Sequence, residues 1–238
     1  MTNIFLPQSG NLGDTCNILP VLSGLYKHTG QKIHLKVRDK MKNFKGFKAL
    51  MEAQDCIASL KFESSKTDKI YHAAYLANDY TKSLNRPWET CRYEEFFRYN
   101  LNINLKVDDE FELFVPIIED SYTSHKTYIV GDRSYSKDAD TRRSFDVLKN
   151  SGKFSEDKCT YLDYSNDLIT NLNIIRSNPN PLISTFTGIS ILADLMKKEA
   201  MILYPEELSF WDNKPIQYSF NQHFYRDRNC ELISLEQF

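Results

Sequence analysis

An acidic residue near the start of the chain is the first candidate for chemistry. Asp14 lies in the tripeptide Gly13-Asp14-Thr15, between an apolar segment and residues that recur at helical spacing. A carboxylate at this place can cap a helix by accepting a bond from a backbone N–H group. It can also act as a general base that takes a proton from a hydroxyl group. The local sequence leaves both interpretations open.

A polar turn in the last quarter of the chain is the second candidate. Residues 184–190 read Ser-Thr-Phe-Thr-Gly-Ile-Ser and separate an apolar run from a segment with helical spacing. Backbone N–H groups at a helix start, flanking hydroxyl groups and a small residue suit the binding of a diphosphate. An ordinary capped turn has the same composition, and the spacing matches neither a P-loop nor the G-x-G-x-x-G pattern.

A basic segment bears on the choice of partner. Residues 31–48 hold seven lysines and arginines against one acid, Asp39, in a chain whose net charge is -2. Such a segment is either a solvated surface or a face that binds an anion, such as the phosphates of DNA or a phosphorylated sugar. The low glycine content and the many Asn, Lys, Tyr and Phe residues are typical of AT-rich genomes, including those of many phages, which favours DNA slightly.

The surrounding sequence predicts the elements that position these residues. Segment 3–7 predicts a buried strand, residues 18–26 predict a helix that ends near Gly30, and segment 32–37 predicts a second strand. A strand, a helix and a strand of this length form a parallel unit. Ligands bind at the carboxyl ends of strands in such sheets, and Asp14 follows the carboxyl end of the first strand.

The second half of the chain repeats this alternation after a polar segment, 119–126, that predicts a linker. Strands alternating with helices imply a second parallel sheet covered on both faces. We expect strands at 127–130, 159–163, 181–185 and 201–204, and helices at 141–150, 166–175 and 189–199. In the first half we further expect helices at 41–53 and 89–101 and strands at 56–62, 69–72 and 111–115; the tail, 216–238, must pack on the rest of the chain or cross back to its first half.

The composition is typical of a globular protein of the cytosol. The 238 residues are 41% hydrophobic, yet no apolar run reaches the roughly 18 residues that a membrane span needs. The chain opens without the charged region and cleavage site of a secretory signal. Five scattered cysteines without a C-x-x-C pair predict reduced thiols. We therefore expect a cytoplasmic protein, in the host cytoplasm if it is viral.

Two stretches of the sequence resemble glycosyltransferase family 9, the heptosyltransferases. Residues 13–22, Gly-Asp-Thr-Cys-Asn-Ile-Leu-Pro-Val-Leu, resemble the opening of that family, and residues 187–204 look like its donor-binding turn, helix and strand. The resemblance implies an α/β protein of the GT-B type, with two Rossmann-like domains facing across a cleft. The acceptor domain would span residues 1–116 and the nucleotide-sugar domain residues 117–238.

The resemblance also implies roles for individual residues, with Asp14 as the catalytic base. No metal and no cofactor is expected, because a nucleotide diphosphate sugar serves as co-substrate. The expected donor-binding residues are Arg133, Ser134, Lys137, Thr185, Thr187, Gly188, Ile189, Ser190 and Glu207. The expected acceptor-binding residues are Gly13, Thr15, Lys36, Arg38, Lys40 and Lys42.

The expected activity is therefore an inverting sugar transfer to a hydroxyl group of an anionic acceptor, either a hydroxymethylated base of phage DNA or a lipopolysaccharide sugar. A competing pattern, Asp138-Ala139-Asp140, is the D-x-D with which GT-A glycosyltransferases hold a metal ion. Here it lies in a polar stretch where Asp140 can cap a helix. A non-catalytic nucleotide- or sugar-binding module and a DNA-binding accessory protein remain alternatives.

Overall fold

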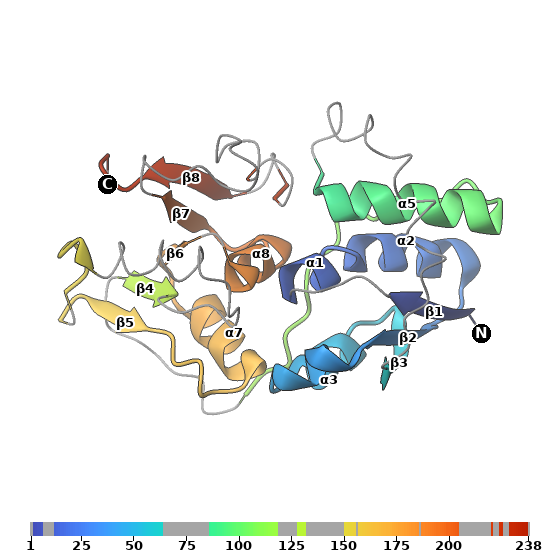
Figure 1. The fold of residues 1–238 in the computed structure, drawn as a ribbon, viewed down its shortest axis with the longest axis horizontal. Coiled ribbons are helices and arrows are strands. Elements are labelled where there is room, and N and C mark those ends of the chain that lie inside the picture. The colour runs from blue at the N-terminus through green and yellow to red at the C-terminus, as the bar shows by residue number, and fades with distance from the viewer. Residues whose placement is uncertain are drawn as a thin grey trace.

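The computed structural model of the chain contains two parallel sheets (Figure 1). It describes residues 2–6, 12–63, 86–118, 128–131, 150–155, 157–185, 187–204, 220, 224–225 and 229–237. The α/β class predicted from the sequence is confirmed, because every strand pair in both sheets is parallel.

The first sheet has the order β1-β2-β3, from Thr2–Leu6, Ile33–Arg38 and Ile57–Glu63. In β2 the apolar residues Ile33, Leu35 and Val37 are buried and the residues between them are half-buried, as the alternating sequence predicts. The helical elements of this half are α1 (Leu12–Cys16), α2 (Leu19–Thr29), the 3-10 helix η1 (Asp39–Asn43), α3 (Phe47–Glu52) and α5 (Trp88–Leu101).

The predicted helix after the first strand is divided into two. The short helix α1 already begins at Leu12, and α2 begins after Ile18 with Pro20 in its first turn. Proline has no backbone N–H to continue the hydrogen bonding of α1, so a new helix starts there. Asp14 therefore lies inside the first turn of α1, and the interpretation of Asp14 as a helix cap is wrong. The predicted end at Gly30 is confirmed, since Gly30 has a left-handed φ of 69°.

The second sheet has the order β5-β4-β6-β7-β8. Its strands are β4 (Tyr128–Gly131), β5 (Cys159–Tyr161), β6 (Leu182–Ser184), β7 (Ala200–Tyr204) and β8 (Cys230–Ser234), with helices α7 (Leu168–Ser177) and α8 (Gly188–Leu195). Strand β8 was not predicted: the end of the tail pairs with β7, from Ala200 opposite Cys230 to Tyr204 opposite Ser234. The end of the tail therefore extends the second sheet.

Three other predictions of secondary structure need correction. The helix expected at 41–53 is interrupted by Gly46, whose φ is 79°, so that η1 and α3 are separate. The helix expected at 189–199 ends at Leu195. The strand expected at 111–115 is an irregular extended segment. The strand predicted at 69–72, the linker 119–126 and most of the helix at 141–150 lie outside the described residues, and the domain boundary at 116/117 stays a prediction.

The extended segment 111–116 is held by side chains and by a helix end, which explains why it joins no sheet. Gln54 bonds both backbone groups of Phe114, at 2.8 Å to its carbonyl oxygen and at 3.1 Å to its N–H. The Leu113 N–H donates to the carbonyl of Leu195 at the end of α8, at 2.8 Å. The Arg176 guanidinium of α7 donates to the Val115 carbonyl. The segment therefore fastens α3 of the first half to α7 and α8 of the second.

The two sheets share one apolar core. Buried side chains of the first half, such as Leu22 and Phe47, belong to the same continuous cluster as Leu172 and Ile202 of the second half. A smaller cluster around Ile183 covers the other face of the second sheet. All five cysteines are buried. Of the helices that the structure describes, none is both long enough and apolar enough to cross a bilayer.

Helices α1 and α8 pack against each other (Figure 1). Each contributes a glycine to the contact, Gly13 and Gly188. A Cβ atom on Gly13 would lie 2.3 Å from Cδ1 of Ile191, and one on Gly188 would lie 3.0 Å from Cβ of Leu12. Such distances leave no room for a methyl group unless a neighbour moves. The two loops that the sequence singles out, one after β1 and one after β6, therefore lead into helices packed directly on each other.

This packing predicts the outcome of a double-mutant cycle. Gly13→Ala should lower the free energy of unfolding by about 1–3 kcal/mol, because the new methyl group overpacks the contact. Adding Ile191→Val removes Cδ1, so the double variant should be more stable than the sum of the two single effects by about 0.5 kcal/mol or more. Urea unfolding monitored by circular dichroism measures this. Ile189→Val is the control, since Ile189 faces Gly131 instead; strict additivity in the Gly13–Ile191 cycle would contradict the packing.

Candidate active site

The contact between α1 and α8 brings Asp14 next to the turn after β6. Gly13 adjoins Asp14 in sequence, and its backbone N lies 3.2 Å from the position of a Cβ on Gly188. The Asp14 side chain is partly exposed. Its charge acts on groups of three elements: Cys16 in α1, Lys40 in η1 and Glu89 in α5. A carboxylate so placed can take a proton from a hydroxyl group that reaches it.

The turn after β6 presents three buried hydroxyl groups. Oγ of Ser184 and Oγ1 of Thr185 are shielded from solvent and have no hydrogen-bond partner among the described residues. The Thr187 side chain is buried too and accepts from the Ser190 N–H in the capping box that starts α8. A buried polar atom without a partner costs about 1–3 kcal/mol, so two such hydroxyl groups in one turn point to a ligand that bonds them. The hydroxyl groups precede the start of α8, where backbone N–H groups favour an anion. Ser184 was not among the residues selected from the sequence, although it ends an apolar strand in the predicted turn.

Two other residues predicted to bind the donor have structural roles. Ser190 is buried; its hydroxyl donates to the Thr187 carbonyl at 2.7 Å and accepts from the Thr187 N–H at 3.1 Å. It therefore fixes the start of α8. The Ile189 side chain is buried against β4, with Cγ2 3.4 Å from a Cβ placed on Gly131. A donor contact at Ile189 would have to come from its backbone.

The end of β4 lies close to the end of β6. A Cβ on Gly131 would lie 3.0 Å from Oγ of Ser184, so this glycine leaves space beside the first of the three hydroxyl groups. The segment that follows Gly131 contains the predicted donor-binding residues Arg133, Ser134 and Lys137. These three residues, and Glu207 after β7, lie outside the described residues.

Two of the predicted acceptor residues are in ion pairs with acids. Lys36 pairs with Glu63 at 2.8 Å, and Lys42 pairs with Asp39 at 2.5 Å. By contrast, the Lys40 side chain is exposed over most of its surface. The part that is buried lowers its pKa, and so does the positive charge of Arg38, whereas the negative charge of Asp14 raises it. Lys40 therefore lies within the electrostatic reach of both Arg38 and Asp14, whereas Lys36 and Lys42 are neutralised by acids.

Gly13 and Thr15, also predicted to bind the acceptor, face the protein. Gly13 packs against Ile191, as described above. Thr15 is buried, with its hydroxyl 3.8 Å from Sδ of Met41. Cys16 is buried as well. Burial is the main reason that the pKa of its thiol lies far above the ordinary value, and the charge of Asp14 adds to this effect, so the thiol is unreactive. Among the residues at the start of α1, Asp14 is therefore the one with a partly exposed side chain suited to acid–base chemistry.

Glu89 of α5 is a residue within the electrostatic reach of Asp14 that the sequence did not indicate. Burial raises the pKa of Glu89 to about 7; Arg92 opposes this shift and the charge of Asp14 adds to it. The sequence predicts α5 correctly as a helix, but nothing in it signals that the first turn of this helix lies near Asp14. The proximity depends on tertiary packing and could not be read from spacing.

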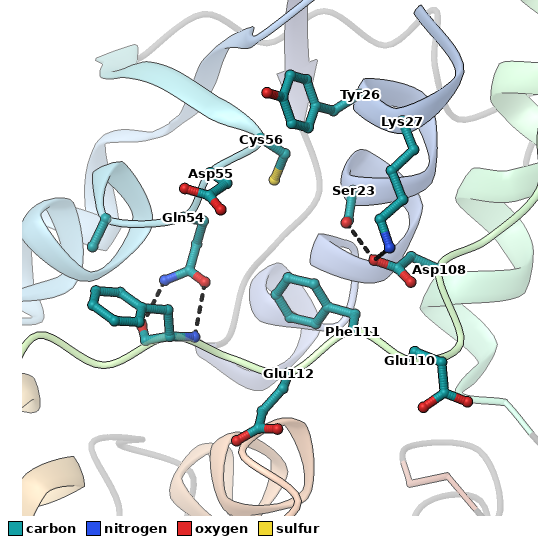
Figure 2. Close-up of a pocket in the computed structure, with 12 residues that line it drawn as sticks. Ser23, Tyr26, Lys27, Gln54, Asp55, Cys56, Asp108, Glu110, Phe111 and Glu112 are labelled. Atoms are coloured by element: carbon teal, nitrogen blue, oxygen red, sulfur yellow. Dashed lines mark hydrogen bonds and ion pairs between the residues drawn. The ribbon is translucent and has the colours of Figure 1, made fainter. Parts of the chain in front are cut away.

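A cavity of about 410 Å³ lies elsewhere in the first half (Figure 2). Its lining includes Tyr26 and Lys27 near the end of α2, the helix that leads into β2, and Cys56 just before β3, so it lies at the amino ends of these strands. Asp108 accepts hydrogen bonds from Ser23 at 2.5 Å and from Lys27 at 2.7 Å; burial acts to raise its pKa, but these bonds outweigh it and the pKa lies below the ordinary value. Three further acids line the cavity: Asp55, Glu110 and Glu112. An acidic cavity at the amino edge does not suit a diphosphate.

The described residues offer no evident metal site. No group of three or more His, Cys, Asp and Glu side chains that could hold an ion occurs in the part of the chain that the structure describes. The D-x-D pattern at Asp138 and Asp140 lies outside that part.

Comparison with known proteins reveals similarity in fold. Neither a protein-family model nor a curated protein sequence matches the chain significantly. Similar solved structures include a glycosyl transferase of family 9 from Veillonella parvula, with a TM-score of 0.58 and 11% sequence identity over 99% of this chain and 86% of that one. The E. coli heptosyltransferase WaaC with ADP has a TM-score of 0.55 and 12% identity over 98% of this chain and 93% of its own. The E. coli ADP-heptose LPS heptosyltransferase II has a TM-score of 0.51 and 10% identity over 98% of this chain and 90% of its own. The chain thus has, over nearly its whole length, the α/β fold with parallel sheets of these glycosyltransferases.

Proposed function

We propose that this protein is a glycosyltransferase that moves a sugar from a nucleotide diphosphate donor to a hydroxyl group of an anionic acceptor. The observation that carries the proposal is the packing of α1 on α8, which sets Asp14 beside a turn with three buried hydroxyl groups. Two of them, those of Ser184 and Thr185, have no hydrogen-bond partner among the described residues. The fold supports it, since the similar structures are family 9 glycosyltransferases or heptosyltransferases, one of them with ADP.

The donor diphosphate would bind at the start of α8. Backbone N–H groups near Thr187 and Gly188 and the hydroxyl groups of Ser184, Thr185 and Thr187 would contact its oxygens. Arg133, Ser134 and Lys137 would add a hydroxyl group and two cations from the loop after β4, and Glu207 would bind the ribose. These contacts stabilise the negative charge that grows on the departing diphosphate, which is the main electrostatic demand of the reaction.

Asp14 would act as the general base. Its carboxylate takes the proton of the acceptor hydroxyl as the acceptor oxygen forms a bond to the anomeric carbon of the donor sugar. The bond from that carbon to the diphosphate oxygen breaks, and its electron pair leaves with the nucleoside diphosphate. Attack from the face opposite the diphosphate inverts the anomeric configuration. The protein would need no metal ion for this step, because its N–H groups and cations carry the departing charge.

The acceptor would lie on the first half of the chain, close to Asp14. Lys40 lies within the electrostatic reach of both Arg38 and Asp14, so Arg38 and Lys40 are the cations best placed to hold an anionic group of the acceptor. Lys36 is paired with Glu63 and Lys42 with Asp39, which reduces the positive charge available to bind the phosphates of a DNA backbone. We therefore favour a compact anionic sugar, such as one of lipopolysaccharide, over a hydroxymethylated DNA base.

Nucleotide binding is the first test of the donor site. In a thermal-shift screen of UDP, GDP, ADP and CMP, one diphosphate should raise the melting temperature, and ADP is the first choice. Thr187→Val, which removes one hydroxyl group, should weaken that affinity about tenfold, because a hydrogen bond to a charged group contributes about 1.5 kcal/mol or more. Thr170→Val on α7 is the matched control and should bind normally. Absence of any nucleotide effect would contradict the proposal.

Replacement of the proposed base is the second test. Asp14→Asn should slow sugar transfer by about 10²- to 10⁴-fold while nucleotide binding persists, because the amide cannot accept the proton. Asp55→Asn, in the acidic cavity at the other edge of the sheet, is the matched control and should transfer normally. Radiolabelled donor sugar measures transfer, with a sugar phosphate and a hydroxymethylated duplex as acceptors.

Other outcomes of these assays identify the alternatives. Normal turnover by Asp14→Asn would remove this residue from the mechanism. Loss of transfer in EDTA, restored by Mn²⁺, would favour metal binding at Asp138 and Asp140. Nucleotide binding without transfer to any acceptor would indicate a binding module, and salt-sensitive DNA binding unaffected by Thr187→Val would indicate a DNA-binding accessory protein.

A further inference from the structure

Glu89 is a largely buried carboxyl group that the proposed mechanism does not use. It occupies the first turn of α5, and its side chain is 13% exposed, against 31% for Glu95 two turns further along the same helix. A carboxylate loses hydration when it is buried, so a protein keeps one in such a place only with compensating contacts.

Hydrogen bonds fasten the first turn of α5 to the helix that carries Asp14. The hydroxyl group of Thr90, the residue after Glu89, donates to the Asn17 carbonyl at 2.6 Å in a buried contact. The Asn17 N–H in turn donates to the Gly13 carbonyl at 2.9 Å. Glu89 and Asp14 are therefore each one residue away from a continuous chain of hydrogen bonds, which fixes their relative position.

Arg92 holds Glu89 from its own helix. Its Nη1 lies 3.5 Å from Oε1 of Glu89, and its guanidinium carbon lies 5.0 Å from the ring centre of Trp88 and 5.3 Å from that of Tyr93. Its Nε and Nη2 are buried and have no hydrogen-bond partner in the part of the chain that the structure describes. Within the described residues, Glu89 is the acid paired with this cation, and the two aromatic rings restrict the guanidinium to that orientation.

Among the described residues, Arg92 and Asp14 are the charged groups that act on Glu89. Arg92 favours the ionised form of Glu89, whereas Asp14 on α1 and the burial of the side chain disfavour it. The net result is a pKa of about 7, so Glu89 changes its charge near neutral pH. Electrostatic coupling is reciprocal, so the charge of Glu89 acts on Asp14 as strongly as that of Asp14 acts on Glu89.

We propose that Glu89 is a positioning residue that controls the strength of Asp14 as a base through its own charge. Ionised Glu89 repels a second negative charge, so Asp14 holds a proton more strongly and takes it more readily from the acceptor hydroxyl. Neutral Glu89 exerts no such effect. The inference rests on the proposed role of Asp14 and adds to it a dependence of transfer on pH.

The pH dependence of transfer tests the proposal. For the wild type, kcat/KM for the acceptor at saturating donor should rise several-fold through about pH 7 as Glu89 ionises. Glu89→Gln should have the rate of the low-pH form and no step near pH 7, with an unchanged KM for the donor. Glu95→Gln, the matched control, should keep the wild-type profile. A Glu89→Gln enzyme that loses activity equally at every pH, or keeps the step, would overturn the proposal.

A titration that needs no activity separates this inference from the proposed function. In ¹³C NMR of protein with labelled glutamate carboxyl groups, the signal lost in Glu89→Gln should titrate near pH 7 in the wild type and at lower pH in Asp14→Asn. Arg92→Gln should move the same midpoint to higher pH. A midpoint insensitive to Asp14→Asn overturns the inference even if the protein transfers sugar. If the titrations of Glu89 and Asp14 are coupled but the protein transfers no sugar, the electrostatic coupling is supported and the proposed function is contradicted.

Discussion

The close approach of α1 and α8 is the constraint on which the rest of the structure depends. The approach needs glycine at positions 13 and 188, because a methyl group at either would meet Ile191 or Leu12 at 3.0 Å or less. It joins the first helix of one sheet to the helix that follows β6 of the other. As a result, residues far apart in the sequence, Asp14 and Thr187, lie at one place. The segment 111–116 and the shared apolar core maintain this arrangement.

The surroundings of Asp14 follow from the same packing. Arg38 and Lys40 approach from the end of the first sheet, Glu89 from α5, and the hydroxyl groups of the β6 turn from the second sheet. The site thus combines a carboxylate, cations and hydrogen-bond donors at the carboxyl edges of parallel strands, where ligands bind in such sheets. The acidic cavity beside Asp108 lies at the amino edge of the first sheet and has the opposite electrostatic character.

Much of the fold could be predicted from the sequence, because parallel strands and helices leave a local periodic pattern. The strands at 33–38 and 182–184 and the helix α5 are confirmed, and Gly30 ends α2 as expected. Strand β8 was missed because its pairing with β7 depends on a distant segment. The run 111–115 has the alternating pattern of a strand but joins no sheet, because the side chain of Gln54 bonds the backbone N–H and carbonyl of Phe114. For the site, the sequence indicated Asp14 and the β6 turn. It could not indicate Glu89, whose raised pKa results from burial and from a partner on another helix.

The central claim, that Asp14 and the start of α8 line one active site, is tested most directly by the structure of the protein with a non-transferable nucleotide diphosphate sugar. The account predicts that the diphosphate contacts the backbone N–H groups near Gly188 and the hydroxyl of Thr187. It also predicts that the anomeric carbon faces Asp14 with room for one acceptor hydroxyl between them. A sugar bound in the acidic cavity beside Asp108, or on a surface remote from Asp14, would contradict the account.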